Sequence, residues 1–562
     1  MRDATIDPNE LPLQRLYRWE RERPSDIHLT QPLNGKCRDW TWEQTLSEVR
    51  RIAAWLQQFG WEPGTRIGLW SKNCAWWLMA DYAIWMAGYV TVPILPALTP
   101  DSARKIFEHS NVRACIVGHL ENWHKARSAI SPALPLLAFP GSPATEATQW
   151  NDVLTTHAPL AGKPLRDASD LATLIYTSGT TGMPKGVMHT FYTLAAVPRA
   201  MTQHPLVGLR SDDAYFCYLT LAHVGERWAV EANALYTGAR VYFNESLKTF
   251  AEDLRRARPH LFFAVPRLWQ QFQLGILSRL PEGQARLIDD PVRGPELKRQ
   301  LVQGLGLDRA RLAGGGGATM PPALLEWYQN LGLDIVEGYG MTETFGCCTS
   351  NVPGDNRVGT VGKPWPGVEL RISSDGEIQA RAPWNMQGYF QDPEATSEVY
   401  TEDEFLKTGD KGLTDEDGYL SISGRIKEIF KTAKGKYVAP APIENKLHVG
   451  GNIEAVCVTG ADRAQPLAIV MLPAAIRDLV RRDPQKRAEI QQAFDAKLSE
   501  VNASLDPHER LQLIAIVADT WTQESGHLTS TMKIKRDRIE ASYSDQYESW
   551  ATEGTPVVWY RF

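Results

Sequence analysis

Residues 176–186 hold the side chains of this sequence that are best suited to chemistry. The segment contains four Ser or Thr hydroxyls, three glycines and Lys185, and it directly follows the apolar run 171–175. Glycine lets backbone amides turn toward an anion, the hydroxyls donate further hydrogen bonds, and the lysine supplies a positive charge. The pattern therefore predicts a loop that binds phosphate. It is not a Walker A loop, because Lys185 stands between Pro184 and Gly186 with no hydroxyl after it.

A second group of chemically suited residues occupies the segment 337–344, after a short apolar run. Tyr339 offers a flat face on which a base can stack, Thr342 offers a hydroxyl to phosphate, and Glu343 offers a carboxylate that suits Mg²⁺. Upstream, the four consecutive glycines 314–317 indicate a close approach of the backbone to a ligand. Taken alone, the two segments would also fit a solvated turn and a flexible loop.

These strings resemble those of the adenylate-forming (ANL) superfamily, which includes acyl- and aryl-CoA synthetases, luciferases and the adenylation domains of peptide synthetases. The resemblance covers about residues 40–545. It implies that Glu343 and Thr177 hold Mg²⁺ and that Thr342 and Glu343 take part in catalysis. The residues that it assigns to ATP and AMP are Thr177, Ser178, Gly179, Thr180, Thr181, Gly182, Lys185, Gly316, Gly317, Ala318, Gly338, Tyr339, Gly340, Asp410 and Arg425.

Three of these assignments concern the nucleoside. The resemblance implies that Tyr339 contacts adenine and that Asp410, in the string 407–410, accepts both ribose hydroxyls. Binding two hydroxyls needs two acceptor oxygens, which a carboxylate has. Arg425 would reach the ribose as well. Without the resemblance, an aspartate after a glycine is usually a turn residue.

A lysine near the C-terminal end completes the implied site. In the superfamily, a lysine in the stretch that matches residues 528–536 enters the active site during adenylation. Lys533 matches it best, and Lys535 is the alternative, because Met532 stands where many relatives have glycine. Such a cation is needed for a physical reason. A carboxylate and an α-phosphate about 4 Å apart repel by about 4 kcal/mol, roughly a thousandfold in rate.

The resemblance also implies two domains. We expect a large N-terminal domain of layered α/β sheets over 1–424, which binds ATP and the acyl substrate, and a small mobile α+β domain over 425–562. Lys427 occupies the hinge position. Rotation there would withdraw the lysine and bring Gly435 forward to flank a tunnel for the thiol of CoA.

The string 218–227 indicates the substrate. It resembles the Leu-Pro-Leu-Ala-His-x-x-Glu-Arg string of long-chain acyl-CoA synthetases, and His223 would lie where the acyl carboxylate enters. Thr220 and Gly225 depart from that string where the acyl tunnel should be lined. The implied function is an ATP-dependent acid:CoA ligase that acts on a fatty or other hydrophobic carboxylate through acyl-AMP.

Other functions stay open at this point. A fatty acyl-AMP ligase, or a synthetase that loads an acyl carrier protein, would use the same residues with a different acceptor. A non-catalytic nucleotide-binding regulator is a further alternative, although none of the four key side chains is missing. Those side chains are Lys185, Glu343, Asp410 and Lys533.

Periodicity predicts the elements that position these residues. A helix over 41–60 begins with a capping box at Thr41 and Gln44. Short apolar strands alternating with helices predict a mainly parallel α/β sheet, whose ligands bind at the carboxyl ends of strands. The segment 413–423 is predicted to be a hairpin that turns at Asp417-Gly418. After it, an α+β pattern is predicted, with strands at 455–459, 467–472 and 511–517 and helices near 474–482 and 486–503.

Composition sets the class of protein and its expected location. The chain has 562 residues, 43% of them apolar, and a net charge of -6, which argues against a nucleic-acid surface. Seven dispersed cysteines without a C-x-x-C pair favour reduced thiols in the cytoplasm. No apolar run reaches the roughly 20 residues that span a bilayer. A long alkyl substrate would nevertheless allow peripheral membrane contact; the oligomeric state is open.

Overall fold

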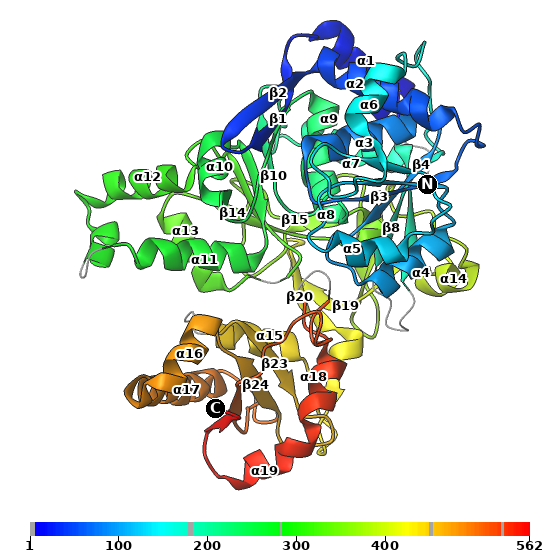
Figure 1. The fold of residues 1–562 in the computed structure, drawn as a ribbon. Coiled ribbons are helices and arrows are strands. Elements are labelled where there is room, and N and C mark those ends of the chain that lie inside the picture. The colour runs from blue at the N-terminus through cyan, green and yellow to red at the C-terminus, as the bar shows by residue number, and fades with distance from the viewer. Residues whose placement is uncertain (1–5, 178–183, 281–283, 319, 449–452, 530–532) are drawn as a thin grey trace.

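The protein folds into a large N-terminal region and a smaller C-terminal region, and the chain passes between them near residue 425 (Figure 1). Two large sheets and a four-stranded hairpin sheet form the first region, and another four-stranded sheet forms the centre of the second. The predicted fold class, layered α/β sheets followed by a small α+β part, is confirmed. The computed structural model describes residues 6–177, 184–280, 284–318, 320–448, 453–529 and 533–562.

A seven-stranded sheet carries the predicted phosphate loop. Its strand order is β7-β6-β5-β3-β4-β8-β9, and its pairs are parallel except for β8 with β9. The antiparallel edge was not predicted; the link from β8 to β9 is too short for the crossover that parallel strands need. The strands are β3 Arg66–Trp70, β4 Val90–Ile94, β5 Ala114–Val117, β6 Leu136–Ala138, β7 Thr148–Gln149, β8 Leu171–Thr177 and β9 Lys185–Thr190.

A nine-stranded sheet carries the glycine-rich and tyrosine-containing segments. Its order is β16-β15-β14-β13-β12-β10-β11-β1-β2, with parallel pairs in the middle and antiparallel pairs at both edges. The strands are β1 Ile27–Leu33, β2 Lys36–Thr41, β10 Ala214–Cys217, β11 Arg240–Phe243, β12 Leu261–Ala264, β13 Leu312–Gly315, β14 Ile335–Tyr339, β15 Thr349–Ser350 and β16 Lys363–Pro364.

Helices fill the space between and around these sheets. The capping box at Thr41 and Gln44 is present, and α2 follows it. Helix α3 is buried along its whole length and contacts both β1 and β3, so it lies between the two sheets. The helices are α1 Pro12–Glu22, α2 Trp42–Gln57, α3 Ala75–Met86, α4 Pro100–Ser110, α5 Trp123–Ala126, α6 Trp150–Thr156, α7 Phe191–Gln203, α8 Val224–Glu226, α9 Asn233–Thr237, α10 Phe250–Ala257, α11 Pro266–Leu277, α12 Gly294–Leu305, α13 Pro322–Asn330 and α14 Pro393–Val399.

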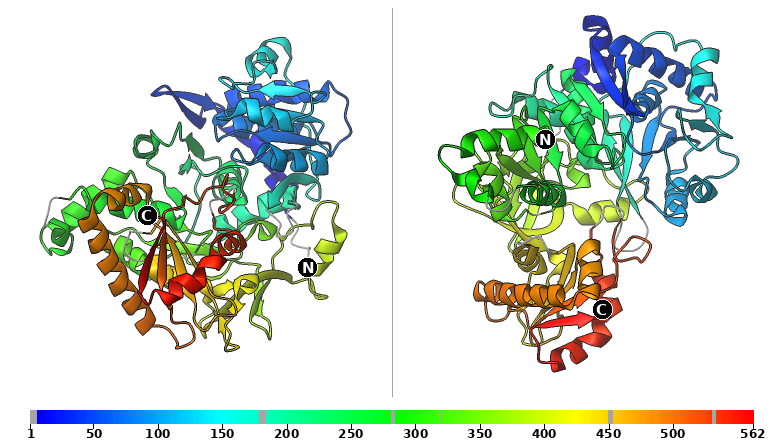
Figure 2. Two further views of the ribbon diagram at one scale, coloured as in Figure 1. Left: turned by 60° about the horizontal axis from the view of Figure 1, so that its bottom comes forward. Right: turned by 60° about the vertical axis from the view of Figure 1, so that its left-hand side comes forward.

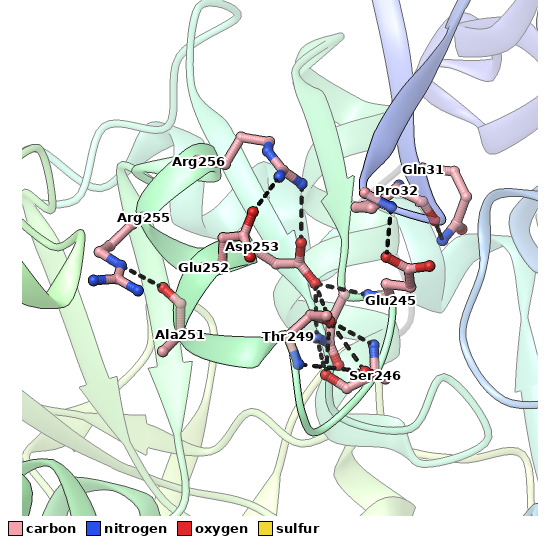
Figure 3. Close-up of polar contacts among 12 residues, drawn as sticks. Gln31, Pro32, Glu245, Ser246, Thr249, Ala251, Glu252, Asp253, Arg255 and Arg256 are labelled. Carbon is pink, nitrogen blue, oxygen red and sulfur yellow. Dashed lines mark hydrogen bonds and ion pairs between the residues drawn. The ribbon is translucent and has the colours of Figure 1, made fainter.

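A network of polar contacts fixes the turn between β11 and α10 (Figure 3). The buried carboxylate of Asp253 accepts hydrogen bonds from the Glu245 amide at 3.0 Å and from the Thr249 hydroxyl at 2.8 Å, and it pairs with Arg256 at 3.0 Å. The Glu245 carboxylate in turn accepts from the Asn34 amide at 2.6 Å. These contacts join the carboxyl end of β11 to the β1–β2 turn, which follows the carboxyl end of the neighbouring parallel strand β1.

The hairpin sheet leads into the C-terminal region. Its strands β17 Glu369–Ile372, β18 Glu377–Arg381, β19 Leu406–Thr414 and β20 Leu420–Arg425 pair antiparallel in that order. The predicted hairpin is confirmed, and Gly418 takes the left-handed conformation (φ +86°) in its turn. Strand β20 runs through Arg425, whose register partner is Asp410.

The C-terminal region has hydrophobic cores of its own. In the right-hand view of Figure 2 its sheet and helices lie below the N-terminal region. Its main sheet has the order β23-β24-β25-β26, and helix α16 begins and ends where the sequence predicted. The elements are β21 Phe430–Lys431, β22 Tyr437–Val438, α15 Pro440–His448, β23 Ala455–Thr459, β24 Leu467–Met471, α16 Ala474–Arg482, α17 Pro484–Ala503, β25 Ile514–Val517, α18 Arg536–Tyr543, α19 Tyr547–Thr552 and β26 Val557–Tyr560.

Candidate active site

The two ends of the predicted phosphate loop lie side by side. Thr177, the last residue of β8, is the register partner of Lys185, the first residue of β9. The strands thus hold the loop's hydroxyl and its lysine at one rim of the seven-stranded sheet. The predicted loop residues between them lie outside the described part of the chain; they are Ser178, Gly179, Thr180, Thr181 and Gly182.

Lys185 and the predicted magnesium ligand Glu343 meet at one aromatic side chain. The Tyr389 hydroxyl donates to Glu343 Oε1 at 2.7 Å, and the Lys185 ammonium lies 4.7 Å from the centre of the Tyr389 ring. Glu343 is 7% exposed, and burial raises the pKa of its carboxyl group. Thr342 beside it is also buried, and its carbonyl oxygen is 2.7 Å from His189 Nε2. Segments that are distant in sequence therefore bring together the residue predicted to bind phosphate, Lys185, and the residue predicted to bind Mg²⁺, Glu343.

Two glycines allow backbones to approach closely at the strand ends, and at Gly340 no other residue would fit. A Cβ atom on Gly316 would lie 3.0 Å from Phe263 Cζ and 3.1 Å from the Gly338 carbonyl oxygen. On Gly340 it would lie 2.2 Å from the Gly346 carbonyl carbon, which no side chain could tolerate. Gly338 itself lies in β14, so the glycine-rich segment and the tyrosine-containing segment touch, as their neighbouring strands require.

The rest of the glycine-rich segment lies at the surface. Gly317 is exposed and takes the left-handed conformation (φ +79°), and Ala318 is exposed beside it. The chain returns to the core at Met320, whose amide donates to Glu337 Oε1 at 3.0 Å. This contact fixes the chain against β14, and the exposed backbone of Gly317 and Ala318 is open to a ligand.

Asp410 joins the tyrosine-containing segment to the hairpin sheet. The Tyr339 hydroxyl donates to Asp410 Oδ2 at 2.6 Å, and Arg425 Nε lies 3.4 Å from Asp410 Oδ1. The three residues that the sequence assigned to the nucleoside are thus in contact. Asp410 is 8% exposed, and burial raises the pKa of its carboxyl group. Contact of Tyr339 with adenine and of Asp410 with ribose stay predictions.

Lys533 enters this group from the C-terminal region. Lys533 is an exposed residue, and partial desolvation of its ammonium lowers its pKa. The charge of Arg425 lowers that pKa further, whereas the carboxylates of Asp410 and Glu428 raise it. The alternative Lys535 precedes the first residue of α18 and is exposed as well. Lys533 therefore lies within electrostatic reach of the predicted nucleoside residues Asp410 and Arg425.

His223 lies within electrostatic reach of the same lysine. Its Nδ1 accepts a hydrogen bond from the Gly225 amide at 3.0 Å at the start of α8. Burial and the charge of Lys533 lower the pKa of His223 to about 4, so the ring is neutral at physiological pH. Because Nδ1 accepts the amide hydrogen, the ring proton is on Nε2. The residue can therefore donate one hydrogen bond to an acyl carboxylate.

Two predicted residues lie in the C-terminal region away from these contacts. Lys427 is exposed in the 3₁₀ turn Ile426–Glu428, directly after β20. Gly435 is exposed in the β21–β22 turn with φ +77°, where an added Cβ atom would meet only the Lys431 side chain of the same hairpin, at 3.7 Å. Their roles as hinge and CoA tunnel stay predictions.

Sequence reasoning missed two residues that shape the site. Tyr389 has no motif around it that would have singled it out. Asn73 follows β3, and its amide nitrogen donates to the Leu219 carbonyl while its oxygen accepts from the Leu221 amide at 2.9 Å. It thereby fixes the loop that leads to His223. A polar residue at the carboxyl end of a buried strand was the available signal.

Comparison with known proteins decides the family. The model of the AMP-binding enzyme family matches residues 16–390, and the model of its C-terminal domain matches residues 427–552. The chain belongs to the AMP-binding enzyme family. A long-chain-fatty-acid–CoA ligase of Mycobacterium bovis, FadD15, is 30% identical over 97% of this chain and 98% of its own length. The peroxisomal long chain acyl-CoA synthetase 6 of Arabidopsis thaliana is 29% identical over 91% of this chain and 82% of its own.

Solved structures share the fold of this AMP-binding enzyme. The adenylation domain of a carboxylate reductase from Mycobacterium chelonae superposes with a TM-score of 0.82 at 21% identity, covering 98% of this chain and 92% of that domain. The anthranilate CoA ligase AuaEII, solved with anthranoyl-AMP, gives a TM-score of 0.77 at 22% identity, covering 96% and 99% of the two chains.

Two properties of the described residues bear on metals and membranes. They contain no cluster of three or more His, Cys, Asp or Glu side chains arranged to hold a metal. A single carboxylate such as Glu343 nevertheless suits Mg²⁺ that arrives with ATP, because Mg²⁺ keeps several waters and uses phosphate oxygens as ligands. None of the described helices has the length and apolar character to span a bilayer.

Proposed function

We propose that this AMP-binding enzyme is an ATP-dependent acid:CoA ligase that activates a fatty or similarly hydrophobic carboxylate. One observation supports the proposal: the charge of Lys533 acts on both Asp410, in the nucleoside group, and His223, in the acyl group, so the lysine lies within electrostatic reach of each. Chemistry that joins a carboxylate to a nucleotide needs a cation at that junction. The activity for which relatives such as the mycobacterial long-chain-fatty-acid–CoA ligase are named supports the acid class.

The first step joins the acid to AMP. A carboxylate oxygen of the substrate attacks the α-phosphorus of ATP, the bond to the β-phosphate oxygen breaks, and pyrophosphate leaves. The Nε2–H of His223 holds the attacking carboxylate, and the ammonium of Lys533 offsets the repulsion between the two anions. Mg²⁺, held by Glu343 with Thr177, would neutralise charge on the departing pyrophosphate.

The second step transfers the acyl group to sulfur. The thiolate of CoA attacks the acyl carbon, the bond to the AMP phosphate oxygen breaks, and AMP leaves. We propose that rotation at Lys427 withdraws Lys533 and brings Gly435 to the thiol, so that one domain serves both steps. A carrier-protein thiol is the alternative acceptor.

The proposal includes where the enzyme works. All seven cysteines are free, and six of them are buried, which suits a reducing cytoplasm. We propose a cytoplasmic enzyme that touches a membrane only peripherally, where a long acyl substrate is dissolved.

An exchange assay tests the proposed function. Acid-dependent ATP–pyrophosphate exchange is measured with acids of graded chain length and aromaticity, and product formation is then measured with CoA or with an acyl carrier protein. We expect exchange with hydrophobic acids and thioester only when CoA is added. Exchange without any thioester would indicate an acyl-AMP ligase, and no exchange with any acid would contradict the proposal.

A further inference from the structure

The segment that contains Tyr389 lies against the phosphate-loop strand. The Gln387 amide donates to the Met188 carbonyl at 3.0 Å, and the Phe390 amide donates to the Gly186 carbonyl at 2.8 Å. The Met386 amide bonds to a different segment: it donates to the Glu343 carbonyl at 2.8 Å. The backbone of residues 386–390 is therefore bonded both to β9 and to the turn that carries Glu343.

Tyr389 makes side-chain contacts to the same two partners. Its hydroxyl donates to the Oε1 atom of Glu343, and its ring faces the ammonium of Lys185. The residue is 7% exposed and packs in a small hydrophobic cluster with Val187 and Met386. The side chain is thus held between a buried anion and a cation.

Without the Tyr389 side chain, Lys185 and Glu343 could form a direct ion pair. The charge of Lys185 already acts on Glu343, and it lowers the pKa of that carboxyl group. Yet no ion pair joins the two in the described part of the chain; the ammonium rests on the ring instead. A direct pair at this depth would be strong and would neutralise both groups. Neither would then be available to phosphate or metal.

We propose that Tyr389 is a positioning residue that keeps Lys185 and Glu343 apart, so that the ammonium can bind the phosphates of ATP and the carboxylate can bind Mg²⁺. The inference rests on the proposed function for the identity of the ligand. It assigns two separable roles to Tyr389. The hydroxyl holds Glu343, the predicted metal ligand, and the ring holds Lys185, the predicted phosphate ligand.

Binding measurements without acid or CoA test the hydroxyl. Mn²⁺ replaces Mg²⁺ as the probe, and its binding to the full chain with ATP is followed by electron paramagnetic resonance. We expect Tyr389→Phe to weaken Mn²⁺ binding about tenfold, the loss of one hydrogen bond to a charged group. ATP binding without metal should stay the same. The control Tyr543→Phe likewise removes a hydroxyl that donates to a carboxylate, that of Asp519 at 3.0 Å in the C-terminal region, and it should leave both affinities unchanged.

A second substitution tests the ring. Tyr389→Leu should weaken metal-free ATP binding as well, because Lys185 is then drawn to Glu343. Adding Glu343→Gln to that variant removes the competing charge and should restore metal-free ATP binding to within about twofold of the wild type. Equal Mn²⁺ affinity in the wild type and Tyr389→Phe, or no restoration by Glu343→Gln, would overturn the inference. A wild-type protein that binds no Mn²⁺ with ATP would instead contradict the proposed function.

Discussion

The nucleotide-facing residues and the Lys533 segment are built in different ways. The former stand in strands: Lys185 begins β9, Tyr339 ends β14 and Asp410 lies in the middle of β19. Lys533 lies outside helix and strand, where its amide donates to the Thr529 hydroxyl at 3.0 Å. The nucleotide-facing residues are therefore held by strands of packed sheets. Lys533 instead stands in a short irregular segment just before α18.

The packing between the two regions shows the same difference. The hydrophobic clusters of the described residues stay on one side of the linker around residue 427; none combines residues from both regions. Charges act across it: the ion pair between Arg267 and Glu454 joins the two regions at 2.9 Å, and Asp410 and Arg425 act electrostatically on Lys533. Charged contacts in water are weak and reversible, which suits a region that must dock and leave. This comparison predicts that substitutions in the two regions separate the two half-reactions.

Apart from loss of the predicted catalytic lysine, the linker substitution should have the largest effect on the complete reaction. Lys427→Pro fixes φ at the predicted hinge. We expect acid-dependent ATP–pyrophosphate exchange to persist while acyl-CoA formation falls by about a hundredfold, the usual consequence of misplaced reacting groups. Lys427→Ala is the control and should keep both activities. Normal acyl-CoA formation by Lys427→Pro would show that the second half-reaction does not need rotation at residue 427.

A change on the fixed side should affect nucleotide binding before anything else. Asp410→Asn removes the charge that Tyr339 and Arg425 contact, and we expect the KM for ATP to rise about ten- to a hundredfold, the range for hydrogen bonds to charged groups. Asp415→Asn, in the exposed turn of the same hairpin, is the matched control. Steady-state kinetics with varied ATP measure this KM. Equal KM values for Asp410→Asn and Asp415→Asn would contradict the role of Asp410 in nucleotide binding.

Acid should destabilise the N-terminal region through its buried histidines. Burial lowers the pKa of His28 to about 3 and of His189 to about 4, below the unfolded value near 6.5. The unfolded chain therefore binds protons first as the pH falls. The stabilisation is complete above about pH 6.5 and is lost progressively down to about pH 4, on the order of 3 kcal/mol for His189.

Urea unfolding at several pH values measures this loss. His28→Phe keeps a ring on Trp42, which stacks 3.6 Å from His28, and removes the titrating group. We expect a flatter dependence of the urea midpoint on pH between 6.5 and 4. His124→Phe, at an exposed position, should keep the wild-type slope. Parallel curves for all three proteins would show that buried histidines do not govern the acid response.

The contact between the regions should give the smallest effect. The Arg267–Glu454 pair is partly exposed, so it is worth up to about 1 kcal/mol, roughly fivefold in the population of the docked arrangement. Arg267→Ala should slow adenylation by no more than that at low salt, and added salt should erase the difference. The reversed pair Arg267→Glu with Glu454→Arg should recover the rate, and Arg279→Ala, just past α11, is the control. A salt-independent loss would mean that Arg267 acts through another contact.

The sequence predicted local elements well, because they depend on local patterns. The capping box at Thr41 and the strand 455–459 follow from residue types within a few positions of each other. The contact of Tyr339 with Asp410 joins residues 71 positions apart, and only the resemblance placed both at one ligand. Tyr389 could not be found from sequence, since its two partners come from different strand ends and its own neighbours show no pattern.

One choice left open by the sequence stays a prediction. Lys533 and Lys535 stand two positions apart in an irregular segment, so composition could not separate them. Both lysines are exposed, and the charges of Asp410 and Arg425 act on Lys533, which favours Lys533.

The two half-reactions of Lys533→Ala, measured beside those of Lys535→Ala, test the central claim that a lysine from the C-terminal region completes the adenylation site. The account predicts that Lys533→Ala loses acid-dependent ATP–pyrophosphate exchange by about a thousandfold, the cost of two unshielded anions. It should still convert supplied acyl-AMP and CoA to acyl-CoA, and Lys535→Ala should retain both activities. Exchange that survives in Lys533→Ala, or that is lost only in Lys535→Ala, would contradict the claim.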